Sequence, residues 1–495
     1  MSNSAGASPA ARRGLGAFLA ILALVELSSG ATQVYITPLL PTIALRFHVS
    51  VGALSWALIA FTLSTAVTTP LLTKLGDLYG HRRVLTLEVA LVAIGSLLVA
   101  TAPNFGLILA GRVLQGMYAA YLPLMFGLVR ARYSHDDTRR SISYLTGVLL
   151  FGILGSLVVV AMIARYAGSP TWAEWLPAGL ALIGVASLVI TRGQYAGGRT
   201  ARAGEAAPRV DWAGFALLAA GLALVLLALS EGPTWGWSSG RVIGCLVAGV
   251  LVLAAWVAVE LRVADPLADV RFLFRPAFLP VYAIGFTLYF ASVGGQVVNA
   301  TFSAAPGKLL GYGFGLDAFQ LSLWGAFGVV FSCVAVVSTP RVSRLIGMRG
   351  VMALGALFAV AGYTLLSIDH ATLAVFEAFL ALAYLGLGFV ESSTRILVVD
   401  ELRDGEVAVG EGIYEMAITV GGAVGSAVFG AITSANASKF PGLATERGYE
   451  LSWVVSALVA LLALIAGVGY LLVGRSKKNA AAKPAAVPPA LEETR

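Results

Sequence analysis

The feature that most constrains this chain is a series of fourteen apolar runs, each long enough to cross a bilayer. A spanning helix needs about 20 mostly apolar residues. The runs exclude a membrane β-barrel, because barrel strands are about 10 residues long and alternate in polarity. We therefore expect an all-α integral membrane protein with fourteen transmembrane helices. The predicted spans are 15–36, 52–73, 84–102, 105–129, 142–164, 174–191, 212–230, 241–260, 278–300, 317–338, 350–368, 372–394, 408–434 and 452–473.

Composition supports this fold class and excludes others. Of the 495 residues, 58% are hydrophobic and only 12% are charged, whereas soluble chains carry about 25% charged residues. Disorder needs the opposite composition. The net charge is +7, but the basic residues are scattered between apolar runs, so no nucleic-acid partner is expected.

Few residue patterns here are typical of an enzyme or a metal site. The two cysteines, Cys245 and Cys333, lie inside apolar runs, and the four histidines form no metal-binding motif. No Walker sequence is present, and no nucleophile stands beside a base. We predict that the chain is not an enzyme and needs no metal and no cofactor.

The basic residues predict the orientation. If the N-terminus is cytoplasmic and the loops alternate, 26 of the 33 Lys and Arg residues are cytoplasmic and six are external, with Arg112 inside a helix. This is the bias expected of a multi-pass protein of the plasma (cell inner) membrane. Both termini are therefore predicted to be cytoplasmic.

Two similar loops indicate an internal duplication. LTKLGDLYGHRR at 72–83 and TPRVSRLIGMRG at 339–350 each combine basic residues, a glycine and short length. Duplicated halves are frequent in transporters. The expected organisation is a disordered tail (1–13), a six-helix bundle (14–191), a cytoplasmic linker (192–211), two extra helices with an interfacial segment (212–276), a second six-helix bundle (277–474) and a disordered tail (475–495).

Ionisable residues within the spans are the candidate proton-coupling groups, because charge inside a membrane is costly and needs a reason. Glu26 lies in the middle of the first span, among small residues, and is a candidate proton carrier or cation-binding group. Arg112 lies in the fourth span and needs an acidic or carbonyl partner. Glu415 lies one turn deeper than Glu411 in span thirteen. The alternative for each is a purely structural hydrogen bond or ion pair.

Other polar and aromatic residues are candidates for substrate binding. With Glu26 and Glu415, the predicted set comprises Tyr35, Tyr118, Tyr121, Gln296 and Asn299. The alternative for each of these residues is a structural role, either packing or a hydrogen bond that bridges two helices. Glu391 is expected to pair with Arg395 four residues on, and Glu88 is expected to be an anchor near the loop arginines.

The loop before the third span suggests a conformational latch. Asp77 can cap a helix or pair with an arginine, and Gly80 allows close backbone approach. Arg82 and Arg83 supply the positive charge. We expect these four residues to hold one conformation, away from any substrate.

These motifs resemble those of the major facilitator superfamily over nearly the whole chain. TKLGDLYGHRR keeps most of the signature between helices 2 and 3 of that family, and RVLQG at 112–116 matches its helix 4 signature. VDWAGFALLAAGLALVLLALSEGPTWGW and VELRVADPLADVRF are similar to the fourteen-helix drug:proton antiporter branch. The resemblance implies two rocking bundles and a proton-coupling role for Arg112.

Two positions depart from that branch. Thr32 stands where the branch commonly has an aspartate, and Glu26, almost two turns earlier, is similar to a glutamate of some twelve-helix multidrug antiporters. The helix 5 signature keeps Gly147, Gly152 and Gly155 but has Ile153 in place of its proline.

The function expected from residues and resemblance together is proton-coupled efflux of amphipathic drugs or natural products by alternating access. The proton gradient would be the energy source, and the partners would be a small-molecule substrate, protons and lipid, with the protein acting as a monomer. Two alternatives stay open: a proton symporter that takes up a small metabolite, and a membrane sensor that no longer transports. The sequence does not identify the substrate or the proton stoichiometry.

Overall fold

The computed structural model describes residues 9–130, 135–191, 210–263, 266, 270–271, 275, 278–400 and 407–481. Helix makes up 86% of the structure, and the described residues contain no strand. Within the described ranges, fourteen stretches are long and apolar enough to cross a membrane. The predicted fold class and number of spans are therefore confirmed.

The first six spans contain eight α-helices and three short 3₁₀ segments. They are α1 (Pro9–Val34), η1 (Thr37–Leu39), α2 (Leu40–Phe47), α3 (Val51–Tyr79), α4 (His81–Ala100), α5 (Phe105–Gln115), η2 (Gly116–Ala120), α6 (Tyr121–Arg130), α7 (His135–Tyr166), η3 (Pro170–Glu174) and α8 (Trp175–Ile190).

The remaining eight spans and their connections contain ten helices. They are α9 (Trp212–Trp235), α10 (Gly240–Glu260), α11 (Leu279–Ser292), α12 (Gln296–Ala304), α13 (Gly307–Leu310), α14 (Ala318–Ile346), α15 (Met348–Ile368), α16 (Leu373–Asp400), α17 (Val407–Ala435) and α18 (Glu446–Ala481). The short α13 belongs to the connection between α12 and α14.

Two spans are broken where proline removes a backbone donor. The first span runs from Gly16 to Phe47, well beyond the predicted end at residue 36, and it is interrupted at η1, which contains Pro38. The fourth span changes to 3₁₀ geometry over η2, three residues before Pro123. The sequence predicted both spans as single uninterrupted helices, so these breaks are a correction.

Side-chain caps explain where several helices begin. Ser50, Asn104, Asp211 and Ser239 each accept a hydrogen bond from the backbone N–H three residues on, at the start of α3, α5, α9 and α10. Asp317 and the N3 glutamine form a reciprocal capping box on α14. Such caps satisfy backbone donors that the first helical turn leaves free.

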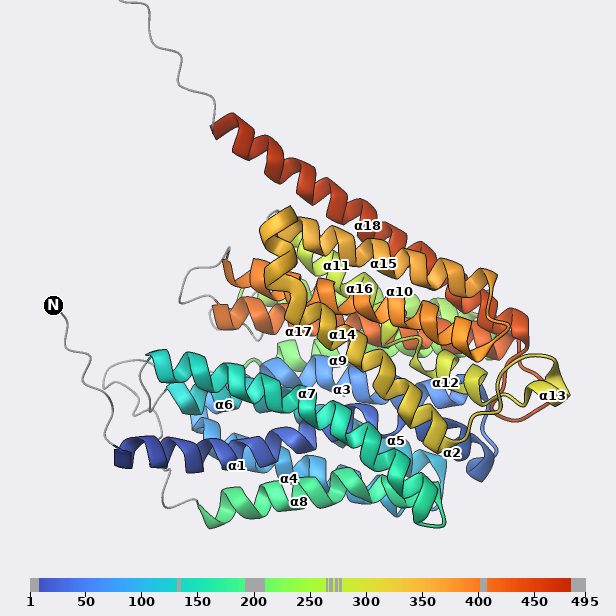
Figure 1. Cartoon of the computed structure of the whole chain (residues 1–495), viewed down its shortest axis with the longest axis horizontal. Helices are drawn as coiled ribbons and strands as arrows, with labels where there is room; N and C mark the ends of the chain where they lie inside the picture. The colour runs from blue at the N-terminus through green and yellow to red at the C-terminus, as the bar shows by residue number, and fades with distance from the viewer. Residues whose placement is uncertain are drawn as a thin grey trace, which may run out of the picture.

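The helices of residues 9–190 gather in one half of the molecule and those from α11 onward in the other (Figure 1). In the first half α1 packs on α7 and α8, and α4 packs on α5 and α8. In the second half α15 packs on α16 and α18, and α11 packs on α17 and α18. Contacts of α3 with α17 and of α7 with α14 join the halves.

The two additional helices, α9 and α10, pack on each other, and α9 also contacts α17 and α3. They therefore lie against the joint between the halves. Only 17% of the apolar stretch of α10 is buried inside the protein. This fits a helix whose apolar surface faces lipid.

The chain begins α1 and ends α18 on one side of the helices, which we call the tail side; α2 and α13 lie on the opposite side, the α13 side (Figure 1). Helices α1 and α18 extend into segments predicted to be disordered, since α1 starts at Pro9 and α18 continues to Ala481. Alanine, lysine and arginine in these segments are good helix formers. Residues 1–8, 482–495 and most of the predicted linker, 192–209, lie outside the described residues.

Candidate transport site

Glu26 is fully buried in α1, with no exposed surface. The hydroxyl of Ser29 interacts with this carboxyl, yet neither carboxyl oxygen has a partner within hydrogen-bond distance among the described residues. A buried polar group without a partner is costly and asks for an explanation. The carboxyl is thus placed to take a partner that is not part of the folded chain.

A second buried carboxyl lies close to the first. Glu88 of α4 is also without exposed surface, and it interacts with the backbone N–H of Ala120 and with Glu26. Neither of its oxygens has a partner within hydrogen-bond distance among the described residues. The hydroxyl of Tyr121, at the start of α6, interacts with both carboxyls and with Ser28, and it has no partner within hydrogen-bond distance in the described chain. The expectation that Glu88 is a loop anchor was wrong, because its side chain points into the core.

Arg112 is fully buried near the end of α5 and bonds mainly to carbonyl oxygens. Its Nε donates to the backbone oxygen of Ala57 (3.1 Å), and one Nη donates to the backbone oxygen of Thr32 (3.3 Å). The same Nη donates to the side chain of Gln115 (2.9 Å), and the guanidinium lies 3.9 Å from the centre of the Phe61 ring. The other Nη has no partner, and Arg112 forms no salt bridge within the described chain.

Gln115 extends this network to two further groups. Its amide nitrogen donates to the hydroxyl of Tyr35 (3.1 Å) and to the hydroxyl of Ser96 (3.0 Å). The predicted substrate residue Tyr35 therefore lies one side chain away from Arg112. Thr32, at the position where the antiporter branch carries an aspartate, presents to Arg112 only a backbone oxygen, because its hydroxyl donates to Ser28.

Tyr118 links the charges of the two halves. Its ring stacks on Phe61 at 5.1 Å between centroids, on the ring that also receives the Arg112 guanidinium. Its hydroxyl interacts electrostatically with Glu415 of the second half as well as with Glu26 and Arg112. Tyr118 therefore lies between the buried network and the second half.

Glu415 belongs to an ion-pair cluster in the second half. Arg395 of α16 contacts Glu415 of α17 at 2.5 Å and Glu391 at 3.4 Å. The hydroxyl of Tyr289 donates to Glu391 (3.1 Å). Each of the three charged side chains is about one-third exposed, at 30–36%. The cluster is therefore partly exposed, unlike the carboxyls in the first half.

The sequence predicted the pair of Glu391 with Arg395 but missed that the same arginine holds Glu415. The spacing of four residues on one helix signals the first contact. The second contact joins α16 to α17 and depends on tertiary packing. The side chain of Glu411 lies outside the described residues.

Gln296 and Asn299 of α12 both bridge helices. The side-chain oxygen of Gln296 accepts from the hydroxyl of Thr37 in η1 (3.1 Å), which connects the two halves. The side-chain oxygen of Asn299 accepts from the indole N–H of Trp453 in α18 (3.0 Å). Both side chains therefore bridge helices in this structure, and a role for them in substrate binding stays a prediction.

The predicted latch is described in part. Gly80 has φ of +96°, a backbone conformation that favours glycine. Arg82 donates to the backbone oxygen of Leu188 and to the hydroxyl of Thr191 (3.1 Å), at the end of α8. A cation at a helix C-terminus is favourable. Arg83 is exposed, and the side chain of Asp77 lies outside the described residues.

One of the three helix 5 signature glycines lies at a close helix contact. A Cβ on Gly152 would lie 3.2 Å from the backbone of Leu27 in α1, and a Cβ on Gly30 would lie 2.8 Å from the backbone of Gly152. A Cβ on Gly147 or Gly155 would meet nothing within 4 Å. Gly30 and Gly152 therefore set the distance between α1 and α7, as small residues do in membrane helix pairs.

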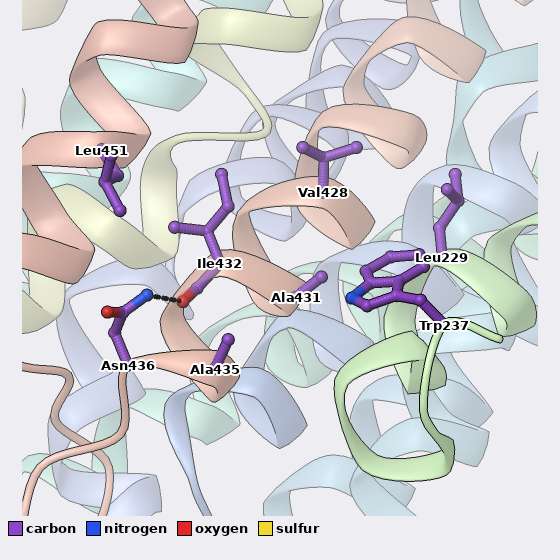
Figure 2. Close-up of a pocket in the computed structure, with 8 residues that line it drawn as sticks. All are labelled: Leu229, Trp237, Val428, Ala431, Ile432, Ala435, Asn436 and Leu451. Atoms are coloured by element: carbon purple, nitrogen blue, oxygen red, sulfur yellow. Dashed lines mark hydrogen bonds between the residues drawn. The ribbon is translucent and has the colours of Figure 1, made fainter.

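A separate apolar pocket of about 240 Å³ lies between α9, α17 and α18 (Figure 2). Its lining includes Leu229, Trp237, Val428 and Leu451. The amide of Asn436 donates to the backbone oxygen of Ile432 (2.9 Å), so its hydrogen bonds stay within α17 and the following loop. None of the predicted site residues lines this pocket.

Comparison with known proteins places this arrangement among transporters. The sequence profile described as the Major Facilitator Superfamily matches residues 22–426. The chain is 27% identical over 398 residues to the "Tetracenomycin C resistance and export protein" of Streptomyces glaucescens, covering 79% of this chain and 71% of that protein. It is 26% identical to the "Cephamycin export protein CmcT" of Amycolatopsis lactamdurans, covering 87% of each.

Solved structures share the fold. An auto-inhibited peptide transporter of the POT family has a TM-score of 0.60 at 16% identity, covering 92% of this chain and 97% of that chain. The xylose transporter XylE from E. coli, in a partially occluded inward-open conformation, has a TM-score of 0.57 at 13% identity, covering 91% and 98%. At these identities the likeness concerns the fold alone.

Proposed function

The chain belongs to the major facilitator superfamily, and from this premise we propose that it exports amphipathic drugs or natural products in exchange for protons. It is a multi-pass membrane transporter and not an enzyme. Relatives named as export proteins for tetracenomycin C and cephamycin support the direction of transport. The proposed location is the plasma membrane, with cytoplasmic termini and a monomer as the working unit.

One observation carries the proton coupling: a fully buried carboxyl, Glu26, and a fully buried guanidinium, Arg112, lie in the same half without pairing with each other. An ionised carboxylate is costly inside a membrane unless something compensates it. In the proposed cycle a proton or a cationic part of the substrate compensates Glu26, and the two compete. Proton binding from outside then drives release of the substrate to the outside.

Arg112 would tune this competition through its neighbours. The Arg112 guanidinium is bound by carbonyl oxygens and by Gln115, and not by a carboxylate of the described chain. The net charge of this region therefore depends on whether Glu26 carries a proton. Tyr118 carries the electrostatic influence between this network and Glu415. The partly exposed Glu415 is proposed to accept the substrate or proton at the water-accessible side of the same path.

Alternating access would move the two halves against each other. The halves are joined by contacts of α3 with α17 and of α7 with α14. The polar bond between Thr37 and Gln296 lies across the halves on the α13 side. In the proposed cycle this bond breaks and forms as that side opens and closes.

Transport by purified protein in liposomes tests the proposal. Ethidium serves as the probe, and the lumen is made acidic relative to the outside. An antiporter accumulates ethidium in the acidic lumen, and nigericin abolishes the accumulation. A symporter instead moves the probe out of the acidic lumen with protons.

Glu26→Gln should abolish gradient-driven accumulation, because the amide cannot carry a proton. Glu377→Gln is the matched control, since Glu377 is also a buried glutamate (5% exposed) but lies in the first turns of α16, at the end of the helix away from Glu391 and Arg395. Ethidium movement that is unchanged both by the pH gradient and by Glu26→Gln would refute the proposal.

A further inference from the structure

Three potential metal ligands converge on the α13 side, outside the proposed transport path. His370 follows α15 in the turn before α16, and Glu446 and Glu450 lie on the first turns of α18. One ligand atom from each lies within 4.8 Å of the others. The two glutamates are four residues apart on one helix, but the histidine is 76 residues away from the nearer one, so sequence spacing does not reveal the cluster.

The imidazole of His370 is held in one orientation. Its Nδ1 lies 3.1 Å from the backbone oxygen of Leu366, and because a carbonyl oxygen only accepts, Nδ1 carries the proton of this bond. The ring packs against Phe302 and Trp453, with centroids at 5.4 and 5.0 Å, and the side chain is only 10% exposed. A backbone carbonyl on one ring nitrogen is the usual support for a histidine whose other nitrogen binds metal.

The free nitrogen of this ring faces two carboxylates. Nε2 lies 3.4 Å from Glu446 Oε1 and 4.0 Å from Glu450 Oε1. With its proton on Nδ1, a neutral imidazole presents a lone pair here, so three electron-pair donors point at one another. A cation among them would satisfy all three at once.

The distances suit a shared metal ion. The contact of Nε2 with Glu446, at 3.4 Å, is longer than the usual length of about 2.7–3.2 Å of an N–H···O bond, and the contact with Glu450, at 4.0 Å, is beyond hydrogen-bond reach. Zinc bonds of about 2.0–2.2 Å in a tetrahedral site place neighbouring ligand atoms about 3.4 Å apart. Imidazole with carboxylates is a donor set that suits zinc.

We propose that His370, Glu446 and Glu450 bind one Zn²⁺ ion on the α13 side, with water in the fourth position. The glutamate side chains are 46% and 44% exposed, so the ion reaches the site directly from solvent. Binding joins the turn between α15 and α16 to the start of α18. Trp453, which packs on His370, also donates to Asn299, so the ion stabilises the contact between α18 and α12.

Titration of ZnCl₂ into the full chain, purified in detergent without a polyhistidine tag, tests the site by calorimetry. We expect one Zn²⁺ per chain and a rise in the melting temperature of the wild type. Glu450→Gln and His370→Gln should each weaken binding at least about 10-fold, the smallest loss seen when even a supporting residue of a metal site is removed.

His48→Asn is the matched control, because His48 is an exposed histidine on the same side. Its φ of 52° is tolerated by asparagine, and this variant should bind zinc as the wild type does. Glu450→Gln changes an exposed side chain, so it tests the site even where His370→Gln disturbs the packing of Trp453.

Three results would overturn the proposal. The first is a wild type without stoichiometric binding. The second is unchanged zinc affinity in Glu450→Gln. The third is a melting temperature of the wild type that ZnCl₂ leaves unchanged.

Discussion

Replacing Gly30 by alanine should separate α1 from α7 and destabilise the protein. The added Cβ would lie 2.7 Å from the nitrogen of Ile153, 2.8 Å from the carbonyl carbon of Gly152 and 2.8 Å from the oxygen of Leu149. All three are backbone atoms, so no side chain can rotate away. Overpacking of this kind costs about 1–3 kcal/mol of unfolding free energy, and three backbone contacts place Gly30→Ala near 3.

Two glycines of α7 provide a graded series. A Cβ on Gly152 would approach Leu27 only to 3.2 Å, so Gly152→Ala should cost about 1 kcal/mol. A Cβ on Gly155 meets nothing within 4 Å. Gly155→Ala should therefore be neutral or stabilising by up to about 1 kcal/mol, the gain in helix propensity.

Reversible unfolding in mixed micelles, followed by tryptophan fluorescence, measures the series. The expected order of stability is Gly30→Ala below Gly152→Ala, below wild type, with Gly155→Ala at or above wild type. Because Gly30 lies one turn after Glu26, Gly30→Ala should also reduce ethidium transport. A neutral Gly30→Ala, or a Gly155→Ala that costs as much, would refute the reasoning.

Three further predictions concern the charged residues. Arg112→Lys should lower the initial rate of ethidium transport at least about 10-fold, because one ammonium cannot serve the same set of acceptors in the planar arrangement of a guanidinium; an unchanged rate in liposomes would contradict this. A double-mutant cycle of Arg395→Gln with Glu415→Gln should give a coupling free energy of about 0.2–1 kcal/mol that falls in high salt, since both side chains are about one-third exposed. A larger coupling free energy that salt does not change would contradict this and would show an ion pair shielded from solvent. Glu88→Met should raise the free energy of unfolding by about 1–3 kcal/mol, since it removes a buried carboxyl with no hydrogen-bond partner in the described chain. A loss of stability in the same micelle assay would contradict this and would reveal a hydrogen-bond partner for the carboxyl.

Local patterns predicted the helices better than their interruptions. The apolar runs predicted all fourteen spans, because burial in lipid requires an unbroken apolar stretch of known length. The first and fourth spans nevertheless contain 3₁₀ segments near Pro38 and Pro123. Such a change in backbone geometry leaves hydropathy unaltered, so the span pattern does not show it.

Glu88 illustrates why the site was harder to predict than the fold. On sequence alone it lies near the loop arginines, Arg82 and Arg83, and an anchor is the natural interpretation. In the structure the rotation of α4 turns it towards Glu26 and Tyr121. Rotation of a helix about its axis depends on packing against its neighbours, which a nearly uniform apolar sequence encodes only weakly.

The sequence by itself determined that this chain crosses a membrane fourteen times, which family it resembles and which ionisable residues are embedded, because these follow from the cost of placing charge and free backbone groups in lipid. Only the tertiary structure decided which embedded groups meet. It placed Glu26 beside Glu88, left Arg112 on carbonyl oxygens and brought His370 to two glutamates of α18. Those contacts join residues far apart in the chain, so they depend on how the helices rotate and pack in three dimensions.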